Sequence, residues 1–151
     1  MISINFLSPM KVKLERVNDA VHFVGSNEDG TEVHFDGAAE IGGEGLGVRP
    51  MQGFLMSLAA CSSIDVVLLL KKMRQKVVDF SVDVQGERVD TVPKTFRTIH
   101  LHYRLSGEIK PEKLEKVLEM AVHQLCSVSK MVEKNVEITY SYAITRSSDE
   151  V

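Results

Sequence analysis

The sequence predicts an α+β protein, on three observations. Short runs that alternate apolar and polar residues fill the first third of the chain and return after residue 78. A stretch over about 50–75 is apolar almost throughout, which is typical of a long buried helix. A later stretch that opens at Pro111 repeats apolar residues at helical spacing. The 151 residues are the usual length of one domain, so we expect a single domain over 1–151.

The N-terminal part, about 10–36, is expected to form three short antiparallel strands. Its alternating runs are separated by turn signals at residues 18–19 and 28–30. The apolar pairs that mark the strands are Val12 with Leu14, Val21 with Phe23, and Val33 with Phe35. The next segment, Gly37 to Gly47, contains five glycines without a usable period and predicts a flexible connector.

The central helix is expected to begin at Pro50, because proline suits the first turn of a helix. Lysines and arginines near residue 75 suit the negative end of the helix dipole. A helix that is apolar on all sides needs cover on all sides, and a small chain does not easily supply it, so we expect an obligate homodimer. A membrane span has a similar length, but Asp65 disfavours it, and no membrane partner is expected.

The C-terminal part, about 78–145, is expected to hold two strands, an amphipathic helix, a short helix and a last strand. The alternating runs lie within 80–84 and 99–105, and the helix after Pro111 has one apolar face. A short helix over 127–134 and a strand over 136–144 should follow. The tail Ser147 to Val151 is expected to be disordered.

Charge and motifs exclude several classes of function. The chain has 18 Lys and Arg against 21 Asp and Glu, so nothing suggests a surface for nucleic acid. It carries no nucleotide-binding glycine motif, and His100 and His102 lack an accompanying metal-ligand motif, so no cofactor and no metal are expected. The first residues do not resemble a secretory signal, so we expect a cytoplasmic protein whose thiols are kept reduced.

The only two cysteines, Cys61 and Cys126, are the candidate reactive groups. Cys61 lies on the central helix among small residues, which leave room for a substrate or a second sulfur. Cys126 lies at a junction between helices, where a helix N-terminus is expected to lower the pKa of a thiol. A redox pair needs Cα atoms within roughly 4.4–6.8 Å, which their separation in sequence permits. Two inert buried thiols are the alternative.

Two segments resemble the signature segments of the OsmC/Ohr family, the osmotically inducible and organic-hydroperoxide-resistance proteins. They are RPMQGFLMSLAAC, which ends at Cys61, and HQLCSVS, which contains Cys126. The resemblance in element order extends over about 10–145. It implies an OsmC-like fold, with antiparallel sheets wrapped around a long buried central helix in an intertwined homodimer, and a site at the subunit interface.

The resemblance also implies a chemistry. Cys61 would attack a small-molecule hydroperoxide and become a sulfenic acid, which Cys126 would resolve into a disulfide. An external dithiol would then reduce that disulfide. The family's peroxidases carry Asn-Pro-Glu near the start of this helix, and the glutamate helps to activate the thiol. Here the matching residues are Arg49-Pro50-Met51, so the sequence is closer to the family's OsmC-like branch.

Two charged residues complete the candidate site. Arg49 could supply a positive field that favours the thiolate of Cys61, or be a solvated residue just before the helix. Asp65, one helical turn beyond Cys61, could orient a side chain or a water, or be paired with a basic residue. The leading hypothesis is a thiol-dependent peroxidase for organic hydroperoxides. The alternative is a non-catalytic dimeric protein that binds a small hydrophobic ligand.

Overall fold

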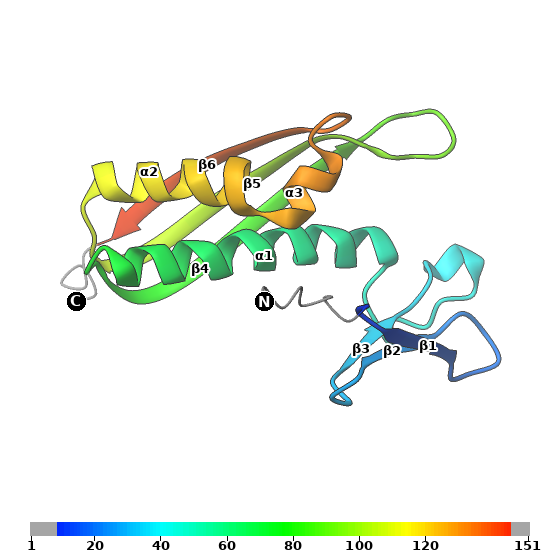
Figure 1. Ribbon diagram of the computed structural model, residues 1–151. Coiled ribbons are helices and arrows are strands. Elements are labelled where there is room, and N and C mark those ends of the chain that lie inside the picture. Colours follow the sequence, from blue (N-terminus) through cyan, green and yellow to red (C-terminus); the bar gives the residue numbers. More distant parts are fainter. Residues whose placement is uncertain (1–8, 146–151) are drawn as a thin grey trace, which may run out of the picture. The chain divides into compact units, whose positions relative to one another are not determined.

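The computed structural model describes residues 9–145, which form two compact units (Figure 1). The N-terminal unit ends at Gly53 and the C-terminal unit begins at Phe54. The expectation of a disordered tail at Ser147 to Val151 lies outside the described residues. A single domain over 1–151 stays a prediction.

The N-terminal unit contains the three expected antiparallel strands, β1 (Val12–Arg16), β2 (Phe23–Asn27) and β3 (Glu32–Phe35), in that order. The second strand begins at Phe23 and not at Val21. Its start is displaced because the Asn18 side chain holds the preceding turn: Oδ1 accepts hydrogen bonds from the backbone N–H of Ala20 and of His22, at 3.0 and 3.1 Å. A 3-10 turn, η1 (Ala39–Ile41), follows β3.

The long helix α1 (Pro50–Lys72) ends before the predicted Gln75. The N–H of Gln75 bonds to the Leu70 carbonyl, and the N–H of Arg74 bonds to the Lys71 carbonyl. This pair of bonds is a Schellman motif, which needs a left-handed residue just after the helix, and Arg74 supplies it with φ 56°. The stop was not predicted because glycine, the usual residue at that position, is absent there.

The C-terminal unit contains a sheet of β4 (Lys76–Arg88), β5 (Phe96–Glu108) and β6 (Glu137–Thr145), with β5 in the middle. The β4–β5 pair is antiparallel, as predicted, but β5 and β6 run parallel. The reason is the connection: α2 (Pro111–Met120), η2 (Ala121–Leu125) and α3 (Ser127–Val132) carry the chain back before β6 begins. The sheet is therefore mixed, which corrects the expectation of antiparallel sheets only.

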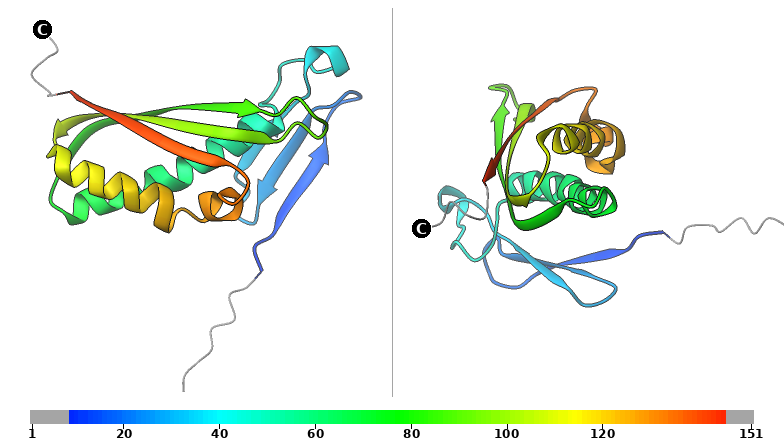
Figure 2. Two further views of the ribbon diagram at one scale, coloured as in Figure 1. Left: turned by 90° about the horizontal axis from the view of Figure 1, so that it is seen from above. Right: turned by 90° about the vertical axis from the view of Figure 1, so that its left-hand side faces the viewer.

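The core of this unit lies between the sheet and the helices, which cover one face (Figure 2). Alternate residues of β5 from Ile99 to Leu105 are buried against that face. The α2 helix buries Leu114, Val117 and Leu118. The α1 helix buries Leu58, Ser62, Val66 and Leu70, which are spaced four apart and so share one face.

The other side of α1 is apolar and is left exposed by the residues that the structure describes. Ile64 is 61% exposed and Leu68 is 59% exposed. Within the described chain the helix is buried on one side, and the expected cover of its other side by a partner subunit stays a prediction. By length and composition α1 could also cross a membrane, a test that the core helix of a soluble protein passes as well.

Candidate functional site

The fold brings the two thiols together. Cys61 projects from α1, and Cys126 stands at the start of α3. The two side chains lie close enough for Cys61 to influence the pKa of Cys126, although they are far apart in sequence. Both are free thiols, Cys61 half-buried and Cys126 fully buried. A sulfur that solvent reaches thus adjoins one that it does not.

A widened helical turn places Cys126. The segment η2 between α2 and α3 is a π-helical turn, and it closes with a hydrogen bond of 3.0 Å from the Cys126 N–H to the Ala121 carbonyl. Such turns hold an extra residue and are frequent at functional sites. Periodicity alone did not predict it, because the apolar spacing of this segment is compatible with an ordinary helix.

The surroundings of Cys126 are apolar apart from a few hydrogen-bonding groups. Its Sγ accepts a hydrogen bond from the Ser129 N–H at 3.4 Å, and its S–H donates to the Leu58 carbonyl at 3.9 Å. Burial raises the pKa of the Cys126 thiol, the neighbouring Ser129 opposes that rise, and Cys61 adds to it. The expected lowering of this pKa by a helix N-terminus is wrong, because desolvation outweighs the short α3 helix.

A second buried pair lies on the same helix. The hydroxyl of Ser62 on α1 and that of Tyr103 on β5 are 2.6 Å apart, and the Ser62 hydroxyl also reaches the Leu58 carbonyl at 3.2 Å. Burial raises the pKa of Tyr103 to about 12, and the nearby Cys126 contributes to the rise. Neither residue was predicted from the sequence. A serine on the covered face of an apolar helix, and a tyrosine at an inward position of β5, were the available signals.

Asp65 lies one turn beyond Cys61 on α1 and is half-buried. Within residues 9–145 it makes no hydrogen bond and no ion pair. Neither suggested role, orienting a side chain or pairing with a basic residue, therefore has a partner within the described chain. Its place in the site stays a prediction.

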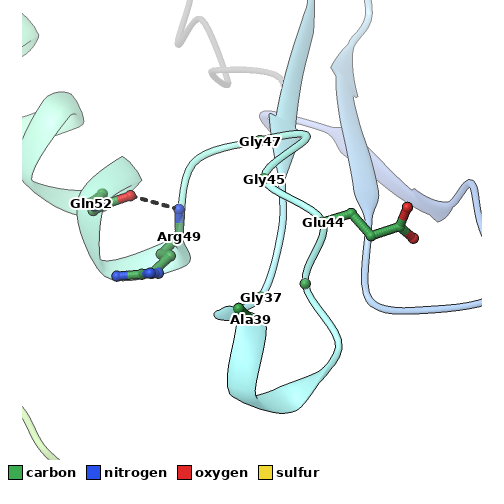
Figure 3. Close-up of a pocket in the computed structure, with 8 residues that line it drawn as sticks. Gly37, Ala39, Glu44, Gly45, Gly47, Arg49 and Gln52 are labelled. Atoms are coloured by element: carbon green, nitrogen blue, oxygen red, sulfur yellow. Dashed lines mark hydrogen bonds between the residues drawn. The ribbon is translucent and has the colours of Figure 1, made fainter.

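Arg49 lines a pocket of about 490 Å³ in the N-terminal unit, together with the glycine-rich loop and the first turn of α1 (Figure 3). Its backbone N–H donates to Gln52 Oε1 at 3.0 Å, so Gln52 serves as the cap of α1. The Glu44 side chain points away from Arg49 and accepts a hydrogen bond from Asn18 Nδ2 at 2.9 Å. The Arg49 guanidinium is exposed.

The glycine-rich loop is ordered, in contrast to the flexible connector that was predicted. The carboxylate of Asp36, 2% exposed, accepts the backbone N–H groups of Gly37, Glu44 and Leu46 at 2.8 to 3.0 Å. These bonds, that from Leu46 foremost, lower the pKa of Asp36 against the opposing effect of burial. A side chain at Gly43 would collide with the Gly37 carbonyl, so the loop depends on glycine there.

Helix geometry bears on the role of Arg49. At about 1.5 Å of rise per residue, the part of α1 from Pro50 to Cys61 spans roughly 16 Å. That span exceeds the reach of an arginine side chain. The role expected for Arg49 beside Cys61 therefore stays a prediction.

Histidines do not form a metal site in the part of the chain that the structure describes. No group of three or more His, Cys, Asp or Glu is placed there to hold a metal ion. His100 and His102 both hydrogen-bond to the Ser141 hydroxyl, at 2.8 and 2.7 Å, across β5 and β6.

A family model described as OsmC-like protein matches residues 42–141, which include both cysteines. The chain belongs to the OsmC family. Protein YhfA of Escherichia coli (strain K12) is 35% identical to it over 127 residues, covering 83% of this chain and 92% of that protein. The resemblance seen in the two cysteine segments is confirmed.

Solved structures agree on the OsmC fold. A hypothetical protein from Aquifex aeolicus VF5 superposes with a TM-score of 0.76 at 29% identity, over 92% of this chain and 99% of that one. An organic hydroperoxide resistance protein from Legionella pneumophila gives 0.68 at 22% identity, over 91% and 98%. The predicted α+β class and OsmC-like fold are confirmed.

Proposed function

We propose that this OsmC-family protein reduces organic hydroperoxides through a thiol and disulfide cycle of Cys61 and Cys126. The observation that carries the proposal is that a half-buried thiol, Cys61, lies close enough to the fully buried thiol of Cys126 to influence its pKa. A hydroperoxide reaches the half-buried Cys61 before the buried Cys126, which lies next to it. In this assignment Cys61 is the peroxidatic residue and Cys126 the resolving one.

The cycle has three balanced steps. The Cys61 thiolate attacks the outer peroxide oxygen, the O–O bond breaks, and the alkoxide takes a proton to leave as an alcohol while Cys61 becomes a sulfenic acid. The Cys126 thiol then loses its proton and attacks the Cys61 sulfur, which expels water and forms the disulfide. An external dithiol reduces that disulfide to two thiols and is itself oxidised to a disulfide. A reducing compartment such as the cytoplasm would keep that dithiol available.

Burial favours this order of events. Because burial raises the pKa of Cys126, that residue stays a neutral thiol at neutral pH and is a poor first nucleophile. Once Cys61 is a sulfenic acid, the adjacent Cys126 needs to lose only one proton in the same step that releases water. Rapid resolution protects Cys61 from irreversible oxidation to the sulfinic acid.

The functional unit proposed here is a homodimer whose chains meet over the uncovered apolar side of α1. Ile64 and Leu68 lie three and seven residues beyond Cys61 and so share its helical face, which places the exposed apolar side next to the reactive thiol. Large exposed apolar patches are rare on monomers.

Relatives lend support to a redox role. The Legionella pneumophila structure is described as a predicted redox protein as well as an organic hydroperoxide resistance protein. An organic hydroperoxide resistance protein from Elizabethkingia anophelis has a TM-score of 0.69 at 18% identity. These names describe those proteins, and they motivate the choice of an organic hydroperoxide as the substrate to test.

The test is peroxide consumption by the reduced protein with cumene hydroperoxide and a dithiol. We expect turnover by the native protein, loss of turnover in Cys61→Ser, and a sulfenic acid that dimedone traps in Cys126→Ser. A native rate no higher than that of Cys61→Ser would refute the proposal.

The alternative function is binding of a small hydrophobic ligand without catalysis. It is favoured by Met51, which stands where the family's peroxidases carry the activating glutamate. Mass spectrometry after a brief peroxide pulse separates the two. A Cys61–Cys126 disulfide supports the redox cycle, whereas two unmodified thiols support binding.

A further inference from the structure

The hydroxyl of Ser129 is a buried polar group without a partner. Ser129 is 1% exposed, and its Oγ makes no hydrogen bond with any of the described residues. Buried hydroxyls are normally paired, because leaving one unpaired costs free energy. The same residue's backbone N–H already donates to Cys126 Sγ at 3.4 Å, and its side chain lies close enough to that sulfur to lower the pKa of the thiol.

The neutral thiol of Cys126 does not need this hydroxyl. Its S–H points to the Leu58 carbonyl, and its sulfur already accepts the Ser129 N–H. A thiolate has no proton to donate and accepts hydrogen bonds more strongly than a thiol. In a site closed to solvent, the anion therefore requires a second donor from the protein.

The neighbouring titratable groups do not stabilise a thiolate at Cys126. Cys61 on α1 and Tyr103 on β5 are the titratable groups that interact with Cys126, and each is neutral or anionic, never cationic. Any negative charge on them would oppose a thiolate at Cys126. Among the side chains around this sulfur, the Ser129 hydroxyl is the one that favours its anionic form.

We propose that the Ser129 hydroxyl is a hydrogen-bond donor reserved for the anionic sulfur of Cys126, and that it makes Cys126 the leaving group when a dithiol opens the Cys61–Cys126 disulfide. The proposal rests on the disulfide cycle proposed above. A thiolate of the dithiol attacks Cys61, a new S–S bond joins them, and the old S–S bond breaks with its electron pair on Cys126. The second thiol of the reductant then attacks the mixed disulfide, releases Cys61 and closes the oxidised reductant.

Access selects Cys61 as the sulfur that a reductant attacks, and the Ser129 hydroxyl offsets part of the cost of leaving a negative charge on the buried Cys126. Cys61 is half-buried and open to a reductant, whereas Cys126 is sealed from solvent. Thiol–disulfide exchange is faster when the departing sulfur is the better-stabilised anion. Without the Ser129 hydroxyl, the anionic sulfur of Cys126 would be less stabilised and would leave less easily.

The first experiment measures the pKa of Cys126 without any redox step. In a Cys61→Ser background, the thiolate absorbance is titrated for the parent, for Ser129→Ala, for Ser129→Thr, which keeps the hydroxyl, and for Ser127→Ala. Ser127 is an exposed serine of the same helix and serves as the matched control. We expect Ser129→Ala alone to raise the pKa by about one unit, a tenfold loss of thiolate, as for a lost hydrogen bond to a charged group.

An unchanged pKa in Ser129→Ala, or an equal rise in Ser127→Ala, overturns the role of Ser129. Circular dichroism on each variant checks that the comparison is made between folded proteins. If Ser129→Ala does not fold, the direction of attack is tested on the native protein by the second experiment.

The second experiment locates the attack. The disulfide is formed with diamide, the protein is treated briefly with a monothiol, and the mixed disulfide is mapped by mass spectrometry. We expect the adduct on Cys61, and an adduct on Cys126 overturns the leaving-group assignment. Diamide forms the disulfide without peroxide, so this experiment does not depend on peroxidase activity. If the protein does not react with hydroperoxide but still gives the Cys61 adduct, the peroxidase function is refuted and the leaving-group assignment stands.

Discussion

The Ser62–Tyr103 hydrogen bond joins the helix that carries Cys61 to the central strand of the sheet, and its two ends should not be equally important for stability. Tyr103→Phe removes one hydroxyl, but Ser62 keeps the Leu58 carbonyl as a partner at 3.2 Å. Ser62→Ala leaves the Tyr103 hydroxyl buried without that partner. Because an orphaned buried group costs more than a lost hydrogen bond, the serine substitution should be the more harmful.

The magnitudes follow from that difference. Tyr103→Phe loses one net hydrogen bond, about 1 kcal/mol, while the ring keeps its edge contact with Phe80. Ser62→Ala orphans a fully buried hydroxyl, about 2 kcal/mol, from which the better helix propensity of alanine subtracts a few tenths. The double variant should cost less than the sum of the two, because the second change removes the orphaned group.

Urea unfolding followed by circular dichroism measures these free energies. Tyr142→Phe, a half-exposed tyrosine of β6, is the control and should change stability by less than about 0.5 kcal/mol. An alkaline series gives an independent readout. The pKa of Tyr103 is raised from 10.0 to about 12, so its contribution is present below pH 10 and is lost as the pH rises through 12. Equal losses for Ser62→Ala and Tyr103→Phe, or additivity in the double variant, would contradict the reasoning.

Two further predictions concern the loop and the surface of α1. The lowered pKa of Asp36 means that its contribution is present above the ordinary value of 3.8 and is lost as the pH falls through the lower, folded-state value. In NMR spectra, the amide resonances of Leu46 and Glu44 should therefore shift on acidification below about pH 4. The Asp36→Asn variant should lack this shift. Resonances that do not move in the native protein would contradict the hydrogen bonds to Asp36. Ile64→Glu and Leu68→Glu should convert the proposed dimer to monomers, as measured by size-exclusion chromatography with light scattering. The control Met131→Glu changes a residue of α3 that is 84% exposed and should leave the dimer intact. A native protein that is already monomeric would refute the proposed dimer.

Much of the fold was predictable, because strong hydrophobic patterns specify it. The strict alternation of β5 and β6 predicted strands, and the spacing after Pro111 predicted a helix. The parallel pairing of β5 and β6 was not predicted, since alternation determines which face a residue takes but not the direction of its neighbour. The end of α1 was missed because an arginine occupies the left-handed position that glycine usually takes.

The sequence identified the two candidate thiols but not their environment. Two cysteine contexts pointed to Cys61 and Cys126, but sequence could not show that Cys126 is sealed from solvent, which reverses the expected direction of its pKa. Burial depends on contacts between distant segments. Ser129 was not predicted either, because an unpaired hydroxyl can be recognised only when its surroundings are known.

The π-helical turn before Cys126 makes the spacing of this segment part of the chemistry. Each helical residue turns the chain by about 100°, so removing one residue between Ala121 and Cys126 would redirect the sulfur while leaving the composition and the apolar face of α2 almost unchanged. A relative that keeps both cysteines but lacks one position here would therefore carry two separate thiols in place of a reactive pair. Alignment gaps in this short stretch should be examined before any function is transferred along the family.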